Sequence, residues 1–319
     1  MSNAFRFLIA IGLILATSGA NAQLFRAYLS INGNDANACT LPAPCRLLPK
    51  ALSAVAPNGE IWMLDSANYN GGTVTIDKSV TILAVPGAVG SVVSVGNGAA
   101  ALSVATPGLT VLLRNLSIVA LAGAPGTTTG LAVAANSKVI LEESLVSGFS
   151  SNGLSVSSGS LMVSKSTLAN NSVALFTSGD GDAMLSGSRI LANVTGTFSN
   201  AGAGLNSTIT IDDCVFSSNS TAVRTFSTTG TALIFLNRSL IEGSTSAALS
   251  AASITPSAIA QIVINGNSIQ RNPGSGWSIT TTSGGTSVII SAGGNNFLTN
   301  GASTGAIQPA SSLPAGSII

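Results

Sequence analysis

Two pairs of oppositely charged residues are the strongest candidates for chemistry in this sequence of 319 residues. Glu143 and Lys165 hold equivalent places in two successive sequence repeats, and so do Asp213 and Arg238 in a later pair. A lysine or arginine base beside carboxylates suits a polysaccharide lyase, whereas two carboxylates suit a glycoside hydrolase. Glu143, Lys165, Asp213 and Arg238 are therefore the candidate catalytic residues.

A second group of residues could bind a saccharide without cleaving it. The candidates for substrate binding are Glu142, Asp212, Arg224 and Trp277. The rings of Trp277, Phe176 and Phe198 could stack on sugars, but filling of the core is the favoured interpretation. The charged residues have a simpler interpretation too, as exposed ion pairs at a turn that contribute about 0 to 1 kcal/mol each.

The absence of histidine from the sequence excludes several kinds of site. Hydrolases whose serine or cysteine relies on a histidine base are ruled out, and a zinc site lacks its usual ligands. Asp180 and Asp182 could offer two oxygens to calcium, which in proteins takes about six to eight. We therefore expect no metal site and no cofactor, with calcium as the one ion that a lyase would call for.

Charged residues make up 7% of the sequence, and its net charge is +1. Lysine and arginine are spread singly along the chain, so we expect no binding to nucleic acid or to an anionic membrane surface. The apolar residues, 45% of the total, are enough for a large core in one elongated domain.

The first 22 residues have the layout of a secretory signal peptide. Arg6 carries a positive charge, residues 7–16 are apolar, and Ala20-Asn21-Ala22 forms a cleavage site of small residues. An N-terminal membrane anchor is the alternative, but the apolar stretch is short and no cysteine follows to carry a lipid. We expect a secreted or periplasmic protein that begins at Gln23 and is not an integral membrane protein.

From about residue 138 onward the sequence repeats every 22 to 28 residues. Each repeat contains a nine-residue segment that ends on an apolar residue, which we call the anchor. The anchors are Val146, Leu168, Ile190, Phe216, Ile241, Ile269 and Phe297. Apolar residues alternate before each anchor, as at Ile209 and Ile211, which is the period of a β-strand. A second short strand carries the anchor, and a third follows it.

One repeat of this kind cannot bury its apolar side alone, so successive repeats must stack as the rungs of a solenoid. The predicted fold class is all-β, a single-stranded right-handed parallel β-helix with three strands in each rung. A leucine-rich repeat is the structural alternative, but it requires a leucine-dominated strand and a helical or extended return. The predicted divisions are 1–22 (signal peptide), 23–59 (entry segment), 60–307 (β-helix) and 308–319 (C-terminal tail).

The entry segment carries two further predictions. Cys39 and Cys45 flank a short proline-containing stretch in a chain that we expect to be exported, so they are predicted to form a disulfide. Residues 47–56 have an amphipathic pattern, which predicts a short helix capping the open N-terminal end of the stack. Cys214 is then left as a free thiol.

Stacking brings equivalent residues into columns spaced by about 4.8 Å. Three residues before the anchors, Glu143 should therefore lie next to Lys165, and Asp213 next to Arg238. The carboxylates of these two groups are three rungs apart, about 14 Å. A glycoside hydrolase needs a separation of about 5 to 9.5 Å, so the columns argue against a paired-carboxylate hydrolase.

Three other columns predict structural or surface roles. Three residues after the anchors, an asparagine ladder is predicted at Asn171, Asn193, Asn219, Asn272 and Asn300. Two residues before the anchors, small polar residues should point inward, with Cys214 among them as a buried thiol. Six residues before the anchors, an apolar stripe should face outward at Ile140, Met162, Met184, Phe235 and Val263. A loop or the C-terminal tail should cover the stripe, and self-association through Met162, Met184 and Phe235 is the alternative.

The sequence resembles the pectin-lyase-like superfamily of right-handed parallel β-helix proteins. Its entry segment, Ser30-Ile-Asn-Gly-Asn-Asp-Ala-Asn-Ala-Cys with Pro44-Cys45-Arg46 and Gly59-Glu60-Ile61, is similar to that of uncharacterised exported bacterial β-helix repeat proteins. The superfamily includes polysaccharide lyases, hydrolases, pectin esterases and non-catalytic surface proteins, so the fold alone implies no single activity. The Asn-Thr-Asp, Gly-His-Gly and Arg-Ile-Lys motifs of polygalacturonase-type hydrolases are missing from the sequence.

The sequence thus predicts an exported β-helix protein that contacts polysaccharide or the cell surface and has no defined catalytic centre. Two alternatives stay open. One is a polysaccharide lyase or hydrolase that acts on uronate-type glycans, and the other is a purely structural or self-associating surface protein.

Overall fold

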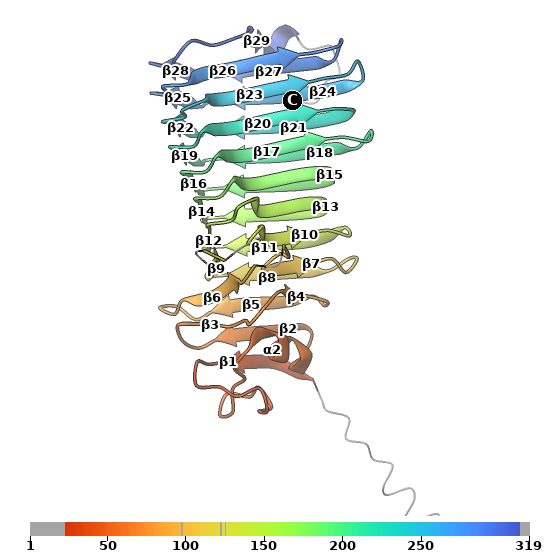
Figure 1. Cartoon of the computed structure of the whole chain (residues 1–319), viewed down its shortest axis with the longest axis vertical. Helices are drawn as coiled ribbons and strands as arrows, with labels where there is room; N and C mark the ends of the chain where they lie inside the picture. The colour runs from red at the N-terminus through yellow and green to blue at the C-terminus, as the bar shows by residue number, and fades with distance from the viewer. Residues whose placement is uncertain (1–22, 97, 122, 125, 313–319) are drawn as a thin grey trace, which may run out of the picture.

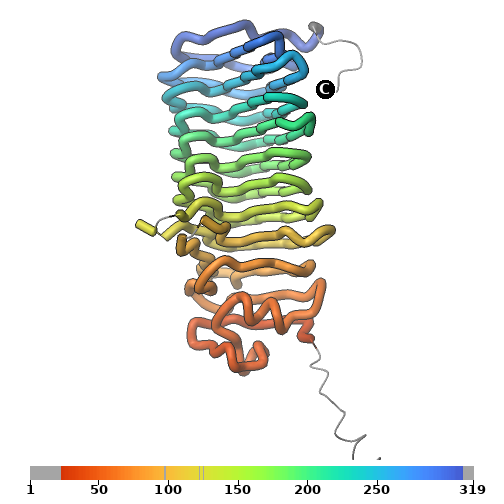
Figure 2. Tube along the Cα trace, turned by 45° about the vertical axis from the view of Figure 1, so that its right-hand side comes forward, coloured from red at the N-terminus to blue at the C-terminus, as the bar shows by residue number. Residues whose placement is uncertain are grey.

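The protein is described by a computed structural model over residues 23–312, apart from positions 97, 122 and 125. This part of the chain is a right-handed parallel β-solenoid of about nine rungs, as the sequence predicts. Figures 1 and 2 show the rungs stacked in sequence order from the N-terminal to the C-terminal end. The predicted signal peptide at 1–22 lies outside the described residues.

Each rung passes through three faces, which we call the first, second and third. The strands of the first face are β1 (Leu24–Leu29), β2 (Val55–Met63), β5 (Val80–Ala84), β8 (Thr110–Arg114), β11 (Ser137–Glu142), β18 (Asn206–Asp212), β21 (Gly230–Asn237), β24 (Ala258–Asn265) and β27 (Thr286–Gly293). Two long strands, β13 (Asn152–Ser164) and β15 (Val173–Ser186), each run from the third face of one rung into the first face of the next.

The second face is narrow and carries the anchors. Its strands are β3 (Ala67–Asn68), β6 (Gly90–Ser94), β9 (Leu116–Ala120), β12 (Leu145–Ser147), β14 (Thr167–Ala169), β16 (Arg189–Leu191), β19 (Val215–Ser217), β22 (Leu240–Glu242), β25 (Ser268–Gln270) and β28 (Asn296–Leu298). From Val146 to Phe297 the anchors pair in one unbroken column. The predicted stacking of the repeats is therefore confirmed.

The third face closes each rung. Its remaining strands are β4 (Val74–Thr75), β7 (Leu102–Val104), β10 (Thr129–Val133), β17 (Thr195–Ala201), β20 (Thr221–Ser227), β23 (Ala247–Ser253) and β26 (Ser275–Thr281). The chain then adds β29 (Gln308–Pro309) and the 3₁₀ turn η1 (Ala310–Ser312). Every named strand pair is parallel, and inward residues alternate with outward ones along each strand, so each face has one buried and one exposed side.

The N-terminal end combines a predicted cap with an unexpected strand. Helix α2 (Leu48–Ala54) buries Leu48, Ala51 and Leu52, as expected for a cap. The strand β1, which the sequence analysis did not predict, pairs in parallel with β2. The sheet therefore begins at Leu24, and the predicted division at residue 60 coincides with no break in it.

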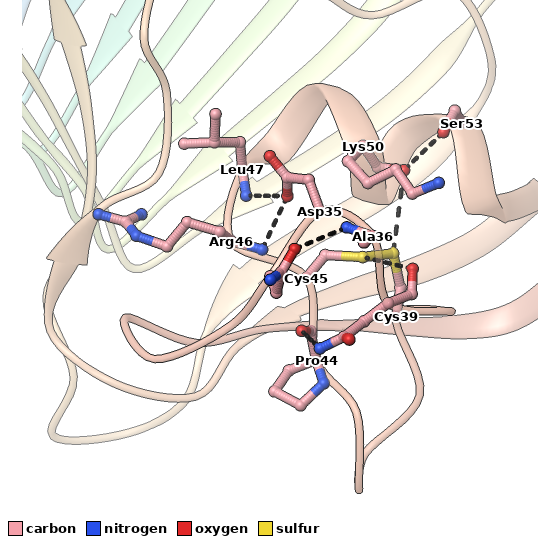
Figure 3. Close-up of a disulfide and its surroundings, with 11 residues drawn as sticks. Asp35, Ala36, Cys39, Pro44, Cys45, Arg46, Leu47, Lys50 and Ser53 are labelled. Atoms are coloured by element: carbon pink, nitrogen blue, oxygen red, sulfur yellow. Dashed lines mark hydrogen bonds between the residues drawn. A yellow bond between two sulfur atoms is a disulfide. The ribbon is translucent and has the colours of Figure 1, made fainter.

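The predicted disulfide joins Cys39 and Cys45 in the loop before the capping helix. Asp35 holds the same loop, because one of its carboxylate oxygens accepts the backbone N–H groups of Arg46 at 2.8 Å and Leu47 at 2.9 Å (Figure 3). Both links hold the loop close to the residues that come directly before the helix.

Left-handed backbone conformations border the second face on both sides. Three residues before the anchors, φ lies between 45° and 66° at Glu143, Lys165, Gly187, Asp213, Arg238, Gly266 and Gly294, and the same holds for Asn115, three residues before the Ile118 that pairs with the first anchor. Two residues after the anchors, φ is again positive at Gly148, Asn170, Ala192, Ser218, Gly243, Arg271 and Thr299. Side chains other than glycine and asparagine are disfavoured in this conformation. The charged residues of the first column thus occupy sharp corners of the solenoid.

Two polar ladders run through the interior beside these corners. The amide of Asn171 donates to Oδ1 of Asn193 at 3.1 Å, and that of Asn193 to Oδ1 of Asn219 at 3.0 Å. In the predicted serine column, the Ser166 hydroxyl accepts the Ser144 backbone N–H at 3.1 Å. Both predicted ladders are confirmed, and they supply hydrogen-bond partners to corner backbone that would otherwise be buried without any.

Asn193 is the residue on which this ladder depends most. It is almost fully buried, donates to three oxygens, and accepts both the backbone and the side-chain N–H of Asn171. We predict that Asn193→Ala lowers the free energy of unfolding by about 3 kcal/mol or more, because buried backbone groups lose their partners. Chemical denaturation measures this change. Asn237→Ala, on the outward side of β21, is the control and should change stability by less than about 0.5 kcal/mol; equal losses would contradict the ladder's role.

Candidate functional site

The candidate catalytic residues Glu143 and Lys165 lie at neighbouring corners of the second face. Both line one hollow of about 440 Å³, together with Leu145 and Thr167. Glu143 is held by Arg114 of the preceding rung, whose Nε and Nη2 donate to its carboxylate at 3.1 and 3.2 Å. These bonds lower the pKa of Glu143 below its ordinary value. A carboxylate held in this way is a poor proton donor.

The second candidate pair is arranged differently from the prediction. Arg238 makes its ion pair with Asp212 and not with Asp213. Asp213 occupies the sharp corner and is exposed, whereas Asp212 ends β18 on the outward side of the first face. A long arginine side chain from the next corner reaches the outward carboxylate. A third pair of the same kind, Arg271 with Glu242, escaped the sequence analysis.

The separation of the two acidic groups agrees with the sequence-based estimate. Glu142 pairs with Ser164, Ser164 with Ser186, and Ser186 with Asp212, so three rung spacings separate Glu142 from Asp212. This is about 14 Å, beyond the range of a carboxylate pair that cleaves a glycosidic bond. Within the described part of the chain, no group of three or more metal-ligating side chains is present, and no helix is long and apolar enough to cross a membrane.

The predicted substrate-binding residues do not gather at one place. Glu142 and Asp212 lie on the first face, and Arg224 lies on the third face. Trp277 belongs to the inward column of the third face, where it pairs with Leu249. Its ring meets Phe297 edge-on at 5.2 Å, and its N–H donates to the Gly305 carbonyl at 3.0 Å. Trp277 thus fills the last rungs and is not a platform for a sugar.

The third face instead brings together a cluster that the sequence analysis did not assemble. Phe176, Phe198 and Arg224 occupy one outward column on three successive rungs, and Phe226 lies beside them. The two first rings meet edge-on at 5.4 Å, and the Arg224 guanidinium lies 4.5 Å from the ring centre of Phe198 and 5.9 Å from that of Phe226. We call these four residues the aromatic–arginine cluster.

The surroundings of this cluster make it distinct on its face. The same column carries Ser155 on the rung before it and Ser250 on the rung after it. All four cluster side chains are partly exposed. Among the described residues, Arg224 has no carboxylate partner, unlike Arg114, Arg238 and Arg271. The only signal in the sequence was a run of large side chains at positions where other repeats carry serine.

A second surface feature lies on the first face, where the predicted outward stripe is only partly exposed. Met162 and Met184 are 45% and 40% exposed and lie with Ile140 along a groove of about 470 Å³. We call this the methionine groove. Its other lining residues include Lys138, Ser160, Asp182 and Thr208. Farther along the same stripe, Val263 is only 5% exposed because it packs in an outer cluster with Phe235, Val288, Ile290 and Ala310.

Comparisons with known proteins agree with this architecture. A family model described as "Right handed beta helix region" matches residues 112–301. The solved structure of XylC with xylose superimposes with a TM-score of 0.59 at 9% identity, covering 85% of this chain and 69% of that one. Pectate lyase Pel9A gives a TM-score of 0.47 at 14% identity, with 94% and 84% covered. A rhamnogalacturonan lyase gives 0.45 at 11%, with 88% and 84% covered. At these identities the likeness concerns the fold alone, and no curated protein matches the sequence significantly.

The left-handed backbone at Lys165 allows a direct test of whether this side chain contributes to stability. Glycine occupies the same corner at three other rungs, at Gly187, Gly266 and Gly294. We predict that Lys165→Gly leaves the free energy of unfolding unchanged or raises it by up to about 1 kcal/mol, because glycine removes the strain of a left-handed conformation. Chemical denaturation checks this. Lys138→Gly, in an ordinary strand, is the matched control and should cost about 0.5 to 1 kcal/mol. A similar cost for both variants would contradict the assignment of Lys165 to the corner.

Cys214 lies in the inward serine column and is expected to be unreactive. Its thiol is buried, and burial raises its pKa to about 11. We predict that iodoacetamide at mildly alkaline pH labels Cys214 only after denaturation, which mass spectrometry of native and unfolded protein can follow. Labelling of the native protein at the rate of a free peptide thiol would show that this rung opens, and would contradict the buried column.

Proposed function

The chain belongs to the right-handed β-helix family, and from that premise we propose that it binds polysaccharide outside the cytoplasm through the aromatic–arginine cluster, without cleaving it. The single observation that carries the proposal is the alignment of Phe176, Phe198 and Arg224 on three successive rungs of a face otherwise lined by small residues. Rungs repeat at about 4.8 Å, close to the length of one sugar unit, so an extended glycan can contact successive rungs.

The rings of the cluster provide the apolar part of such a contact. A sugar ring has one face rich in C–H groups, and this face packs on the π-surface of an aromatic side chain. The rings of Phe176 and Phe198 meet edge-on, with their planes inclined by 64° to one another. Ser155 and Ser250 lie in the same column on the rungs directly before and after the cluster, and their hydroxyl groups are suited to hydrogen bonding with sugar hydroxyls.

Arg224 indicates which glycans the cluster favours. Its guanidinium lies over aromatic rings and has no carboxylate partner among the described residues. A guanidinium binds a carboxylate through two parallel hydrogen bonds, and this pairing is stronger where neighbouring rings limit access of water. We therefore infer a preference for glycans that carry carboxylates over neutral ones. XylC, which shares the fold, is a protein solved with a sugar, xylose.

Binding without cleavage follows from the engagement of the charged residues. Glu143, Asp212 and Glu242 each pair with an arginine from a neighbouring rung. Asp212 and Glu143 lie too far apart for acid and base to act on one bond. These three carboxylates are therefore engaged in ion pairs between rungs.

Export is supported by the N-terminal pattern and by the disulfide. Cys39 and Cys45 are bonded, and disulfides persist in oxidising compartments such as the periplasm or the extracellular space. A surface rich in serine, threonine and asparagine, with few charges, also suits a protein that meets glycans there.

A lyase is the second candidate, because Lys165 and Glu143 share the hollow of about 440 Å³. A lyase would place the amine of Lys165 as the base that removes a proton next to a carboxylate. This candidate predicts turnover of uronate glycans, with unsaturated products, that Lys165→Gly abolishes while the fold is retained.

Binding and turnover can be measured on the same samples. We predict that the protein is retarded in gels containing polygalacturonate or alginate, and that Phe198→Ala and Arg224→Ala each weaken this binding by about tenfold, which is about 1.4 kcal/mol. With a neutral glycan such as xylan, Phe198→Ala should weaken binding but Arg224→Ala should not. Absorbance of unsaturated products and reducing ends, with and without calcium, should not rise.

Two exposed residues outside the cluster serve as matched controls. Phe25→Ala removes a ring that is 64% exposed on β1, and Arg189→Ala removes an exposed cation on the second face. Both should bind like the unaltered protein. Equal losses in the control and cluster variants would contradict the site, and product formation that depends on Lys165 would replace the binding proposal with the lyase.

A further inference from the structure

The outward side of the first face has an apolar centre bordered by polar residues. In strands β8, β11, β13 and β15 its central column reads Leu112, Ile140, Met162 and Met184. The two methionines are 45% and 40% exposed. In each of these strands, the residues two positions before and two positions after this column are polar or charged. An apolar centre with a polar rim is typical of a surface that binds another protein.

The charges beside this column are arranged symmetrically about β13, the middle strand of the first face (Figure 1). Five described strands of this face precede β13 and five follow it. Lys138 lies one rung before Ser160 of β13, and Asp182 lies one rung after it. Both charged side chains are exposed, and neither has an ion-pair partner among the described residues. A positive and a negative charge thus lie about 5 Å on either side of β13.

A second pair of charges has the same symmetry in the column on the other side of the methionines. Arg114 lies two rungs before Ser164 of β13, and Asp212 lies two rungs after it. The positive charge is again on the N-terminal side. A second copy rotated by 180° about an axis along β13 has its rungs in the opposite order and sets each column against the same column. Arg114 then faces Asp212 of the second copy, and Lys138 faces Asp182.

Opposite charges therefore meet at four places in this arrangement, because a two-fold axis makes each of the two contacts twice. Glu142 is the remaining charge of the two polar columns between β8 and β18, and it meets Ser186. Lys165 lines the hollow of the second face and lies outside the contact. A second copy with its rungs in the same order would set Lys138 opposite Glu142 and leave Asp182 opposite a serine. The charges thus favour the opposite order.

The apolar column also meets its own equivalent in the second copy. Met162 lies on the axis and faces itself, and Ile140 faces Met184. The seven first-face strands from β5 to β21 extend about 34 Å along the stack and about 16 Å along the strands. Contact over this area buries roughly 1,100 Å² in the two copies together, which is slightly more than the roughly 1,000 Å² expected of a specific interface.

We propose that a second copy of this chain docks on the methionine groove, with the two stacks antiparallel and the two-fold axis along β13. Burial of the methionine column favours association, and the four contacts between opposite charges select this orientation. The dimer covers an exposed apolar column that would otherwise be open to other molecules. This inference is independent of the proposed glycan site, which lies on the third face.

Charge reversal in the full-length chain tests the orientation. Sedimentation velocity should show a dimer at about 100 µM protein. Lys138→Asp and Asp182→Lys should each weaken the dimer about tenfold or more, because each reversal sets like charges against each other at two places. An equimolar mixture of the two variants should dimerise again, since every reversed charge then meets an opposite one. Arg189→Asp, an exposed reversal on the second face, is the control and should dimerise like the unaltered protein.

Chemical cross-linking gives an independent measurement. Packed sheets lie about 10 Å apart, so a short bismaleimide should link two copies of Met162→Cys, in which the new thiol faces itself across the axis. Ser250→Cys, on the outward side of the third face, is the control and should not be linked. The native cysteines do not interfere, because Cys39 and Cys45 are bonded and Cys214 is buried.

Four outcomes would overturn the proposal, provided that circular dichroism shows each variant to be folded. The first is a monomer at about 100 µM of the unaltered protein. The second is a loss of the dimer in Lys138→Asp but not in Asp182→Lys, which would indicate two copies with their rungs in the same order. The third is a mixture of the two variants that stays monomeric. The fourth is equal cross-linking of Met162→Cys and Ser250→Cys.

Discussion

The structure depends on a single constraint, which is that no rung can satisfy its own backbone or bury its own apolar side. Each strand of a rung takes its hydrogen-bond partners from the rungs before and after it, so the chain becomes stable only as a stack. The strands meet this constraint through regular pairing, and the left-handed corner residues also donate to backbone carbonyls of the next rung, as Lys165 does to Ser186. Beside these corners, buried asparagine and serine side chains accept the remaining backbone N–H groups, as Asn193 does for Asn171. The anchors then fill the space between these ladders.

The different roles of inward, corner and outward positions explain where functional residues can lie. Inward positions and corners are committed to the fold, and the corners account for most of the charged residues that first suggested catalysis. Glu143 and Arg238 occupy left-handed corners, and each makes an ion pair with a neighbouring rung. Outward positions of the strands are free to vary. The aromatic–arginine cluster lies there, on a column that elsewhere carries small residues, and so does the methionine groove.

Features that recur in every rung could be predicted from the sequence. Features that depend on the reach of one long side chain, or that occur in only a few rungs, could not. The anchors, both ladders and the buried Cys214 could be predicted from the period of the repeats and the polarity of their residues, because the inward positions of every rung need residues of the same kind. The partner of Arg238 could not be predicted, because a long side chain can reach either Asp212 or Asp213. The strand β1 was missed because the entry segment has no repeat to align with. The cluster around Phe198 does not follow from the repeat, because outward residues of the third face differ from rung to rung, as Ser155, Phe198 and Ser250 do in one column.

The most direct test of this account is native-state hydrogen exchange at the corners. The backbone N–H groups of Phe149, Asn171 and Asn193 lie outside the strands and donate to asparagine side chains of the next rung. If the ladders hold the stack together, these amides should exchange only on global unfolding, as slowly as the core strand β18. Exchange as fast as that of the exposed turn at Ser283 would mean that the hydrogen bonds of the ladders do not hold the rungs together, and would contradict the account.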